Sequence, residues 1–296
     1  MSRYANILFD NTFKVVVCAP GNEGLLIKNI ELLIPGKRIK SLILRDKENH
    51  GLSISDKNSI FDMFCTSEDG EQFIVEMQHA PQKNYADRML CYATYPIRNQ
   101  LAKKFAKRHE KVERGEPVDK MDYGLFPVYV VSILNFSIKH ECEDALEEGL
   151  VSRYEILNTH NGEQMTKSLQ FVYLELDRLK AAFGEDYKCK TLLERFAYST
   201  KYMHVLDNCP DGFEDDLLKE YFAATEYANW SIDKQTKYDE AMRTELDIIA
   251  EKAYVREEGI AEGIEKTIMD FKRAGATDEL IAKATGLSLE QIATLK

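Results

Sequence analysis

The sequence predicts an α/β fold whose core follows the order α-β-β-β-α-β, a mixed sheet flanked by helices, with an α-helical region after it. Two observations predict this fold. Before about residue 180, helical periodicity alternates with short strand-like runs, and beyond that point the pattern is helical throughout. With 296 residues, the chain is long enough for one large domain or two ordinary ones. We therefore expect a sheet-containing domain over residues 1–180 and a helical region over residues 181–296.

The individual elements follow from spacing and from residue type. Apolar residues at helical spacing over 21–36 end at a Pro-Gly pair. A nearly all-apolar, β-branched run over 126–136 is typical of a fully buried central strand. Pro96 lies inside the long helix expected over 84–115 and should kink it or split it in two. Further strands are expected over 38–46, 151–157 and 169–176, a hairpin over 60–78, and helices over 190–206, 214–229 and 234–273.

Charge is distributed unevenly along the chain, whose formal net charge is −11. Residues 1–139 carry 20 basic and 17 acidic side chains, a charge of +3, whereas residues 140–296 carry 19 and 33, a charge of −14. The first part can therefore present a basic face to phosphates although the whole chain is acidic. No run of about 18 apolar residues occurs, so no membrane span is expected.

The start of the chain and its cysteines both indicate the cytoplasm. Asp10 and Lys14 interrupt the first apolar stretch, which therefore lacks the plan of a signal peptide. The six cysteines form no Cys-x-x-Cys pair, and most lie in apolar segments. We interpret them as buried thiols of a reducing compartment, and neither they nor the scattered histidines indicate a zinc site.

The hairpin turn, with the sequence SEDGE, can close in two registers. A two-residue turn mixes acidic and apolar side chains on both faces. A three-residue loop ending in Gly70 pairs Ser67 with Glu71 and gives glycine the left-handed position that such loops need. Alternation favours this second register because it makes one face entirely apolar. That face contains Phe61, Met63, Cys65, Phe73, Val75 and Met77.

The other face of the hairpin brings acidic side chains together. In the three-residue register Asp62 lies opposite Glu76, with Gln78 one step along. Two carboxylates this close repel each other unless they share a proton or a hard cation. Mg²⁺ accepts such oxygen ligands, activates water and stabilises charge on a phosphoryl group. The alternative is a solvated outer sheet face whose acids pair with nearby lysines.

These residues resemble the PD-(D/E)XK nuclease superfamily, whose core has the same order of elements. The likeness lies in FD on one strand and IVEMQ on the next, and in the stretches ILFDNTFKVVV, FIVEMQHA, YADRMLCYATYPIRNQ and FPVYVVSIL. Within the superfamily the chain is similar to the PD-(D/E)XK nuclease family transposases, which are allied to the recombination-promoting nucleases. The resemblance covers roughly residues 4–180 and implies a restriction-endonuclease-like core.

The resemblance implies a metal-dependent endonuclease that cleaves DNA phosphodiesters. Asp62 and Glu76 would be ligands of Mg²⁺, with Mn²⁺ as an alternative ion, and the backbone carbonyl of Met77 would add a third ligand. Asp10 and Lys14 match acidic and basic positions in the family's opening segment.

Gln78 departs from the pattern, because the superfamily has lysine at this position. A glutamine amide can orient water but carries no charge. Lys14 or Arg88 would then supply the missing charge, and Arg88 and Tyr92, four residues apart, would share a helix face.

A basic cluster follows on the same helix, with Glu110 and Glu113 as its only acids. Sequence-independent contacts to phosphates need this kind of charge. The alternative is an ordinary solvated helix end, because lysines also stabilise the C-terminus of a helix. The cluster comprises Lys103, Lys104, Lys107, Arg108, Lys111 and Arg114.

The tail over 277–296 predicts two short helices around Gly286, similar to a helix-turn-helix unit. Ser288 and Gln291 form a capping box for the second helix, which offers no Arg or Asn to read bases. A packing or oligomerisation element is the alternative. The expected shared apolar face consists of Leu280, Ile281, Ala284, Leu287, Ile292 and Leu295.

Two functions from different classes therefore remain open. The first is a Mg²⁺-dependent DNA endonuclease, for which cleavage of both strands by one site per chain would suggest a homodimer. The second is a non-catalytic DNA-binding or interaction protein that retains the nuclease fold, as Gln78 and the acidic second half of the chain would suggest.

Overall fold

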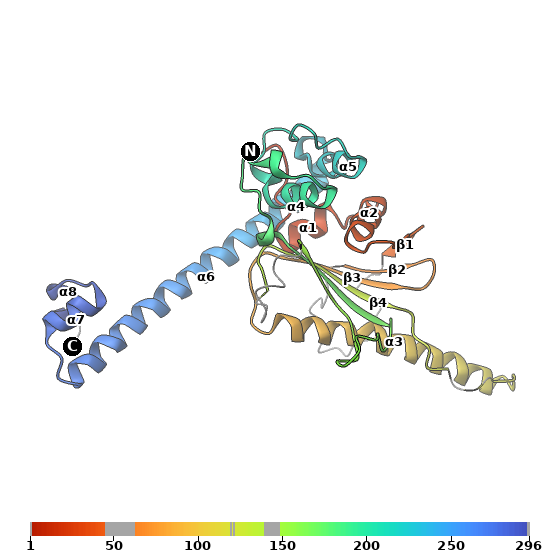
Figure 1. The fold of residues 1–296 in the computed structure, drawn as a ribbon, viewed down its shortest axis with the longest axis horizontal. Helices are drawn as coiled ribbons and strands as arrows, with labels where there is room; N and C mark the ends of the chain where they lie inside the picture. Colours follow the sequence, from red (N-terminus) through yellow and green to blue (C-terminus); the bar gives the residue numbers. More distant parts are fainter. Residues whose placement is uncertain (1, 45–62, 119, 121, 139–148, 295–296) are drawn as a thin grey trace. The chain divides into compact units, whose positions relative to one another are not determined.

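The structure is a computed structural model that describes the whole chain except residues 1, 45–62, 119, 121, 139–148 and 295–296 (Figure 1). The predictions made for Phe61, Asp62 and Leu295 lie outside the described residues.

The described strands form one mixed sheet in the order β1-β2-β3-β4-β6-β5 (Figure 1). Its central strands β3, β4 and β6 are parallel, whereas β1, β2 and β5 join antiparallel at the two sides. The predicted mixed sheet flanked by helices is thus confirmed. The strands are β1 (Leu42–Leu44), β2 (Met63–Ser67), β3 (Gln72–Gln78), β4 (Val128–Leu134), β5 (Val151–Tyr154) and β6 (Leu169–Glu175).

β4 is the strand that the sequence predicts as fully buried. It lies between β3 and β6, and all seven of its residues are buried. Its apolar, β-branched side chains occupy both faces of the sheet because helices cover both faces. The prediction of a central strand over 126–136 is confirmed.

The hairpin adopts the predicted three-residue register. Met63 pairs with Val75, and the Ser67 amide donates to the Glu71 carbonyl at 2.9 Å. Gly70 has φ +86°, the left-handed conformation that the loop requires. Alternation along this hairpin therefore decides which side chains of β3 share a face.

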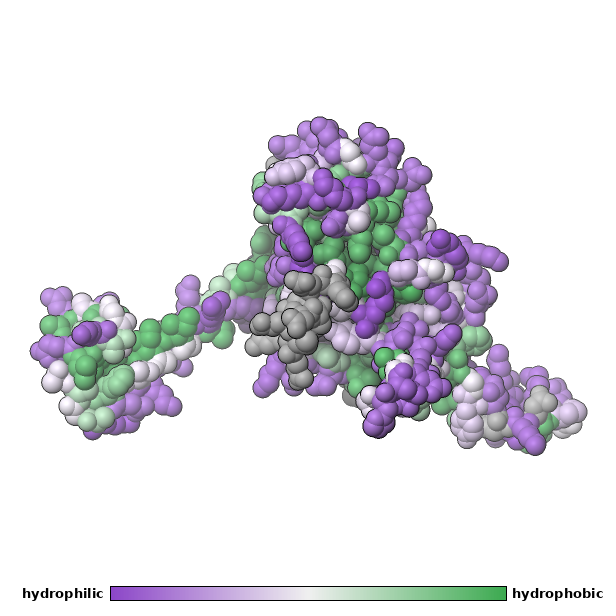
Figure 2. All heavy atoms as spheres, in the orientation of Figure 1, coloured by the Kyte–Doolittle hydropathy of each residue, from purple (hydrophilic) through white to green (hydrophobic). Residues whose placement is uncertain are grey.

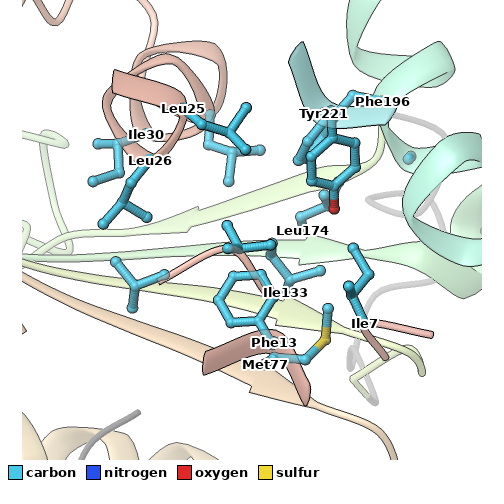
Figure 3. Packing of buried hydrophobic residues seen from close by; sticks show 14 of the residues in the cluster. Ile7, Phe13, Leu25, Leu26, Ile30, Met77, Ile133, Leu174, Phe196 and Tyr221 are labelled. Atoms are coloured by element: carbon cyan, nitrogen blue, oxygen red, sulfur yellow. The ribbon is translucent and has the colours of Figure 1, made fainter. Parts of the chain in front are cut away.

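One face of the sheet holds the larger apolar core. In Figure 3, Phe13 approaches Met77 of β3, and Leu174 of β6 lies between them and Tyr221. Residues near the start of the chain and residues after position 181 both contribute to this core, and both belong to the unit Met1–Asp239. The helices on this face are α1 (Asp10–Val16), α2 (Glu23–Leu33), α4 (Leu192–Tyr202) and α5 (Asp216–Thr225).

The opposite face packs against α3 (Tyr85–Glu113), through Met89 and Ala93 on the helix and Phe64 and Ile74 on the hairpin. The alternative of a solvated outer sheet face is therefore wrong. The sequence of the hairpin alone does not reveal that α3, the next helix along the chain, covers its second face.

Pro96 lies within α3 and is buried, and the helix continues through it as one element. Of the two predicted outcomes, a kink or a split, the split is wrong. The helix crosses the sheet from end to end, because its first turn follows the end of β3 while Gln100 bonds to Gln72 at the start of β3, at 2.9 Å.

The chain divides into two compact units, Met1–Asp239 and Glu240–Lys296, rather than at residue 180. α6 (Ile232–Arg273) begins in the first unit and continues into the second. Apolar side chains lie exposed along it (Figure 2). Short 3-10 helices in the first unit cover Leu176–Arg178, Asp186–Lys188, Met203–Val205 and Tyr227–Asn229.

The second unit contains the predicted pair of short helices, α7 (Asp278–Thr285) and α8 (Leu289–Thr294). Ser288 and Gln291 form the predicted capping box through reciprocal bonds of 2.9 and 3.2 Å. Ile281 and Ile292 pack on Ile268 of α6. The predicted apolar face is wrong at Leu280, which is 58% exposed.

The cysteines in the described part of the chain are free thiols. Cys18, Cys65 and Cys189 are buried, as predicted, whereas Cys91 is exposed on α3. None of the helices described here is long and apolar enough to cross a membrane.

Candidate active site

Glu76 is a carboxylate on the central strand β3, with only 1% of its surface exposed. Its side chain lies on the face that packs against α3, because it alternates with Met77, which lies in the opposite core. The register places Ser132 of β4 beside it, and Tyr173 of β6 beyond. The site therefore lies between the sheet and the first turns of α3.

Gln78 lies on the same face, one pleat further along β3, and is 6% exposed. Its Nε2 donates a hydrogen bond to Oε2 of Glu76 at 3.3 Å. A carboxamide thus contacts the carboxylate from the position where the superfamily pattern has lysine. It can hold the carboxylate and a water molecule in place, but it adds no positive charge.

Tyr85, at the start of α3, closes the site from the helix side. Burial raises the pKa of its hydroxyl, and the charge of Glu76 raises it further. Tyr85 therefore stays protonated at neutral pH, as a neutral group beside the carboxylate. Sequence analysis missed this residue, because a tyrosine in the first turn of a helix is common in apolar cores.

Arg88 is held between two aromatic rings of the same helix. Its Cζ lies 5.7 Å from the ring centroid of Tyr85 and 5.3 Å from that of Tyr92. The expected shared face of Arg88 and Tyr92 is thus observed. Arg88 also donates a hydrogen bond to the Gln82 side chain. Its positive charge lowers the pKa of Tyr85, whereas the charge of Glu76 raises it.

The backbone of Met77 faces the β2 side of the ladder. Gln72 and Gln78 bond through their backbones to Pro127 and Asn135, next to the two ends of β4, each at 2.9 Å. Backbone groups alternate in direction along a strand, so those of Met77 point to the other side. Asp62, expected opposite Glu76 on that side, lies outside the described residues, and its position remains a prediction.

Asp10 and Lys14 lie on α1, which packs on the face of the sheet opposite Glu76. They form an ion pair at 2.8 Å within the helix. The described contacts bring these two residues to each other. The start of α1 nevertheless meets the end of β3, because the rings of Phe9 and His79 lie 4.3 Å apart.

The basic cluster lies at the far half of α3. Lys103 and Lys107 are exposed, whereas Lys104 pairs with Asp122 at 2.6 Å. Because the helix runs away from Glu76, the structure separates these residues from the acidic site.

Glu175 is a second buried carboxylate on the α3 face, which sequence analysis did not single out. Arg178 lies 3.3 Å from it, Ser152 donates to it, and the Ile138 amide donates to it at 2.9 Å. These bonds satisfy the charge and tie β6 to neighbouring segments, so we assign Glu175 a structural role. The sequence signal for this residue is an acidic side chain inside the apolar run LQFVYLEL, which indicates a buried carboxylate.

The donors around Glu76 fit a hard divalent cation. A carboxylate, a backbone carbonyl and a carboxamide all offer oxygen, the ligand that Mg²⁺ and Mn²⁺ prefer. Within the described ranges, no three His, Cys, Asp or Glu side chains converge on one point. Asp62, the second carboxylate that the sequence predicts as a ligand, lies outside those ranges.

Comparison with known protein families supports the resemblance seen in the sequence. The model of a family described as PD-(D/E)XK nuclease family transposase matches residues 7–255. The match therefore covers the whole sheet, α3 and all of the first unit except its first six residues. No curated protein and no solved structure matches the chain.

Proposed function

Because the chain belongs to the PD-(D/E)XK nuclease family transposases, we propose that it is a divalent-metal-dependent endonuclease that hydrolyses phosphodiester bonds of DNA. We propose that it acts in the cytoplasm. The proposal covers hydrolysis alone and does not extend to the joining of DNA ends.

The observation that carries the proposal is the buried contact between Glu76 and Gln78 on β3. A carboxylate is costly to bury unless hydrogen bonds, an opposite charge or a cation stabilise it. Glu76 is buried and has the carboxamide of Gln78 beside it, in the strand position where the superfamily has its acidic ligand.

The proposed roles follow from the donors. Asp62, Glu76 and the Met77 carbonyl would hold Mg²⁺ or Mn²⁺, which supplies an activated water and stabilises charge on the phosphoryl group. Gln78 would orient the attacking water by accepting or donating one hydrogen bond. Apart from Asp62, all the residues with a proposed role here lie in one short segment, residues 76–78, at the end of β3.

A positive charge near the phosphate must come from outside β3. Arg88 is the candidate that the described contacts favour, because it lies against the ring of Tyr85, whose hydroxyl pKa the charge of Glu76 raises. Arg88→Ala should therefore slow cleavage more than Lys14→Ala. Unchanged cleavage in both variants would contradict this assignment.

The test is cleavage of supercoiled plasmid with Mg²⁺ and with Mn²⁺. Wild type should nick or linearise it, and Asp62→Asn and Glu76→Gln should not, although both keep the size of the side chain. Glu175→Gln is the matched control, because it removes an equally buried carboxylate from the same face. It should lower the melting temperature yet leave cleavage by the folded protein.

The second candidate is a DNA-binding protein that does not cleave, which the uncharged Gln78 favours. It predicts that wild type and all three variants bind duplex DNA equally and that none cleaves it with either metal. Cleavage lost in Glu76→Gln but kept in Glu175→Gln would exclude it.

A further inference from the structure

The far half of α3 and the segment after it enclose a basic hollow of about 260 Å³. Among the residues that the structure describes, its lining contains five cations and one acid, a formal charge of +4. The lining consists of Lys104, Lys107, Arg108, Lys111, Val118, Lys120 and Asp122. Figure 2 shows mostly hydrophilic side chains at this end of the helix.

The helical cations of the hollow share one face of α3. At about 100° per residue, positions 104, 107, 108 and 111 fall within an arc of about 100°. Glu110 and Glu113 project outside this arc, and Glu113 lies 3.4 Å from His109 instead. The positive face is therefore not neutralised by the acids that interrupt the cluster in the sequence.

Lys104 shapes the hollow. Its ammonium bonds to Asp122 at 2.6 Å and to the Gly124 carbonyl, and the Gly124 amide in turn donates to Asp122 at 2.7 Å. These bonds hold the segment that carries Lys120 against the helix. One lysine thus serves the architecture, and the others face the opening.

The hollow and Glu76 are connected by a single rigid element. Arg88 marks the end of α3 near Glu76, and positions 104–111 lie 16 to 23 residues further on. At a rise of 1.5 Å per residue, this separation is about 24–35 Å. Gln100 fixes the middle of the helix to Gln72 and to the Phe126 carbonyl, so this separation is held constant.

We propose that the basic hollow binds the phosphate backbone of the duplex DNA that the protein cleaves, about 7–10 base pairs from the scissile phosphate. This inference rests on the proposed function. At about 3.4 Å per base pair, the helix separation corresponds to that number of pairs. A duplex is stiff over this length, so one straight piece of DNA can reach both places.

Several phosphates rather than one small anion fit the hollow. The cations on α3 extend from position 104 to position 111, which is about 10 Å along the helix and about three base pairs of duplex. Lysine and arginine heads at such spacing neutralise backbone charge without reading bases. Binding there should accordingly be independent of sequence and sensitive to salt.

The test is the binding of labelled duplexes of 8, 14, 20 and 30 base pairs, measured by fluorescence anisotropy in Ca²⁺ to avoid cleavage. Wild type should bind more tightly as the duplex lengthens past about 10 base pairs. Lys107→Gln/Lys111→Gln should lose this gain, bind 30 base pairs roughly tenfold more weakly, and show a salt slope smaller by about 2. Both lysines are exposed, so the fold should be kept.

Lys180→Gln/Lys219→Gln is the control, because it removes the same charge from two other exposed lysines, neither of them on α3. Equal binding by wild type and Lys107→Gln/Lys111→Gln would overturn the inference, as would equal losses in the two double variants. Tighter binding of duplex RNA than of duplex DNA would also overturn it. The binding assay does not depend on cleavage. If Lys107→Gln/Lys111→Gln loses the length dependence but wild type never cleaves DNA, only the proposed nuclease activity is refuted.

Discussion

Gln78 is the residue at which the candidate site departs from the superfamily pattern. Its amide contacts Glu76 at 3.3 Å in a position that is 6% exposed. A lysine there would place a charge beside the carboxylate and the attacking water, and a preorganised charge is worth far more in a buried site than in solvent. Glutamine keeps the geometry and gives up that charge.

Gln78→Lys should therefore raise the cleavage rate by about tenfold or more, because the new ammonium stabilises negative charge at the phosphate. Gln78→Met, of similar length but without hydrogen bonds to water, should lower it. Initial rates of plasmid nicking at saturating Mg²⁺ measure both. A Lys variant no faster than wild type would contradict this prediction.

At the scale of elements, the hairpin turn determines which side chains β3 presents to α3. Gly70 makes the three-residue loop feasible, with φ +86°, and its Cα lies close to Phe126. A slip of one residue would exchange the two faces and move Glu76 into the apolar core against α1. The turn is thus as important to the site as the acidic residues.

Gly70→Ala should destabilise the protein by about 1–2 kcal/mol for the left-handed backbone alone, and by more because the new Cβ would lie 3.0 Å from the Phe126 ring. Gly212→Ala is the matched control, because its φ is +81° but its Cβ would meet open space. Urea denaturation measures both. Equal losses would show that the Phe126 ring moves aside without cost.

The start of α4 is stabilised by a capping box in which Thr191 and Glu194 bond reciprocally. Burial tends to raise the pKa of Glu194, but hydrogen bonds from the Thr191 and Lys190 amides outweigh it and hold the pKa below its ordinary 4.5. A carboxyl with a lowered pKa stabilises the fold above its unfolded-state pKa. This contribution is lost as the pH falls through the folded-state pKa.

Glu194→Gln should accordingly cost about 0.5 kcal/mol at pH 7, since water screens the partly exposed carboxylate. The difference from wild type should shrink as the pH falls below 4.5. Urea denaturation at pH 7 and near pH 3.5 compares the two proteins. A difference that grows on acidification would contradict the sign of the pKa shift.

At the scale of the whole molecule, the elements could be predicted from the sequence more fully than the site. Alternation predicted the register of the hairpin, and β-branched content predicted β4, because both signals are local. The burial of Glu76 was not predictable, since it depends on α3 crossing the sheet. Tyr85 and Glu175 were missed for the same reason: their roles arise from neighbours on other elements.

Residues 275–296, the part of the second unit that contains α7 and α8, should be dispensable for cleavage. All proposed metal ligands belong to the first unit, Met1–Asp239, and α8 lacks the arginine or asparagine with which recognition helices read bases. Deletion of residues 275–296 should therefore leave both the cleavage rate and the affinity for duplex DNA within about twofold of wild type. A loss of DNA affinity would instead support a helix-turn-helix role for α7 and α8.

The proposed nuclease activity depends on Glu76 as a metal ligand. The most direct measurement is the initial rate of plasmid nicking as a function of Mg²⁺ concentration, for wild type and Glu76→Gln at equal protein concentration. We predict Mg²⁺-dependent nicking by wild type and a rate at least about a hundredfold lower for Glu76→Gln, with DNA binding unchanged. Equal rates in the two proteins, or no nicking by folded wild type with Mg²⁺ or Mn²⁺, would contradict the account.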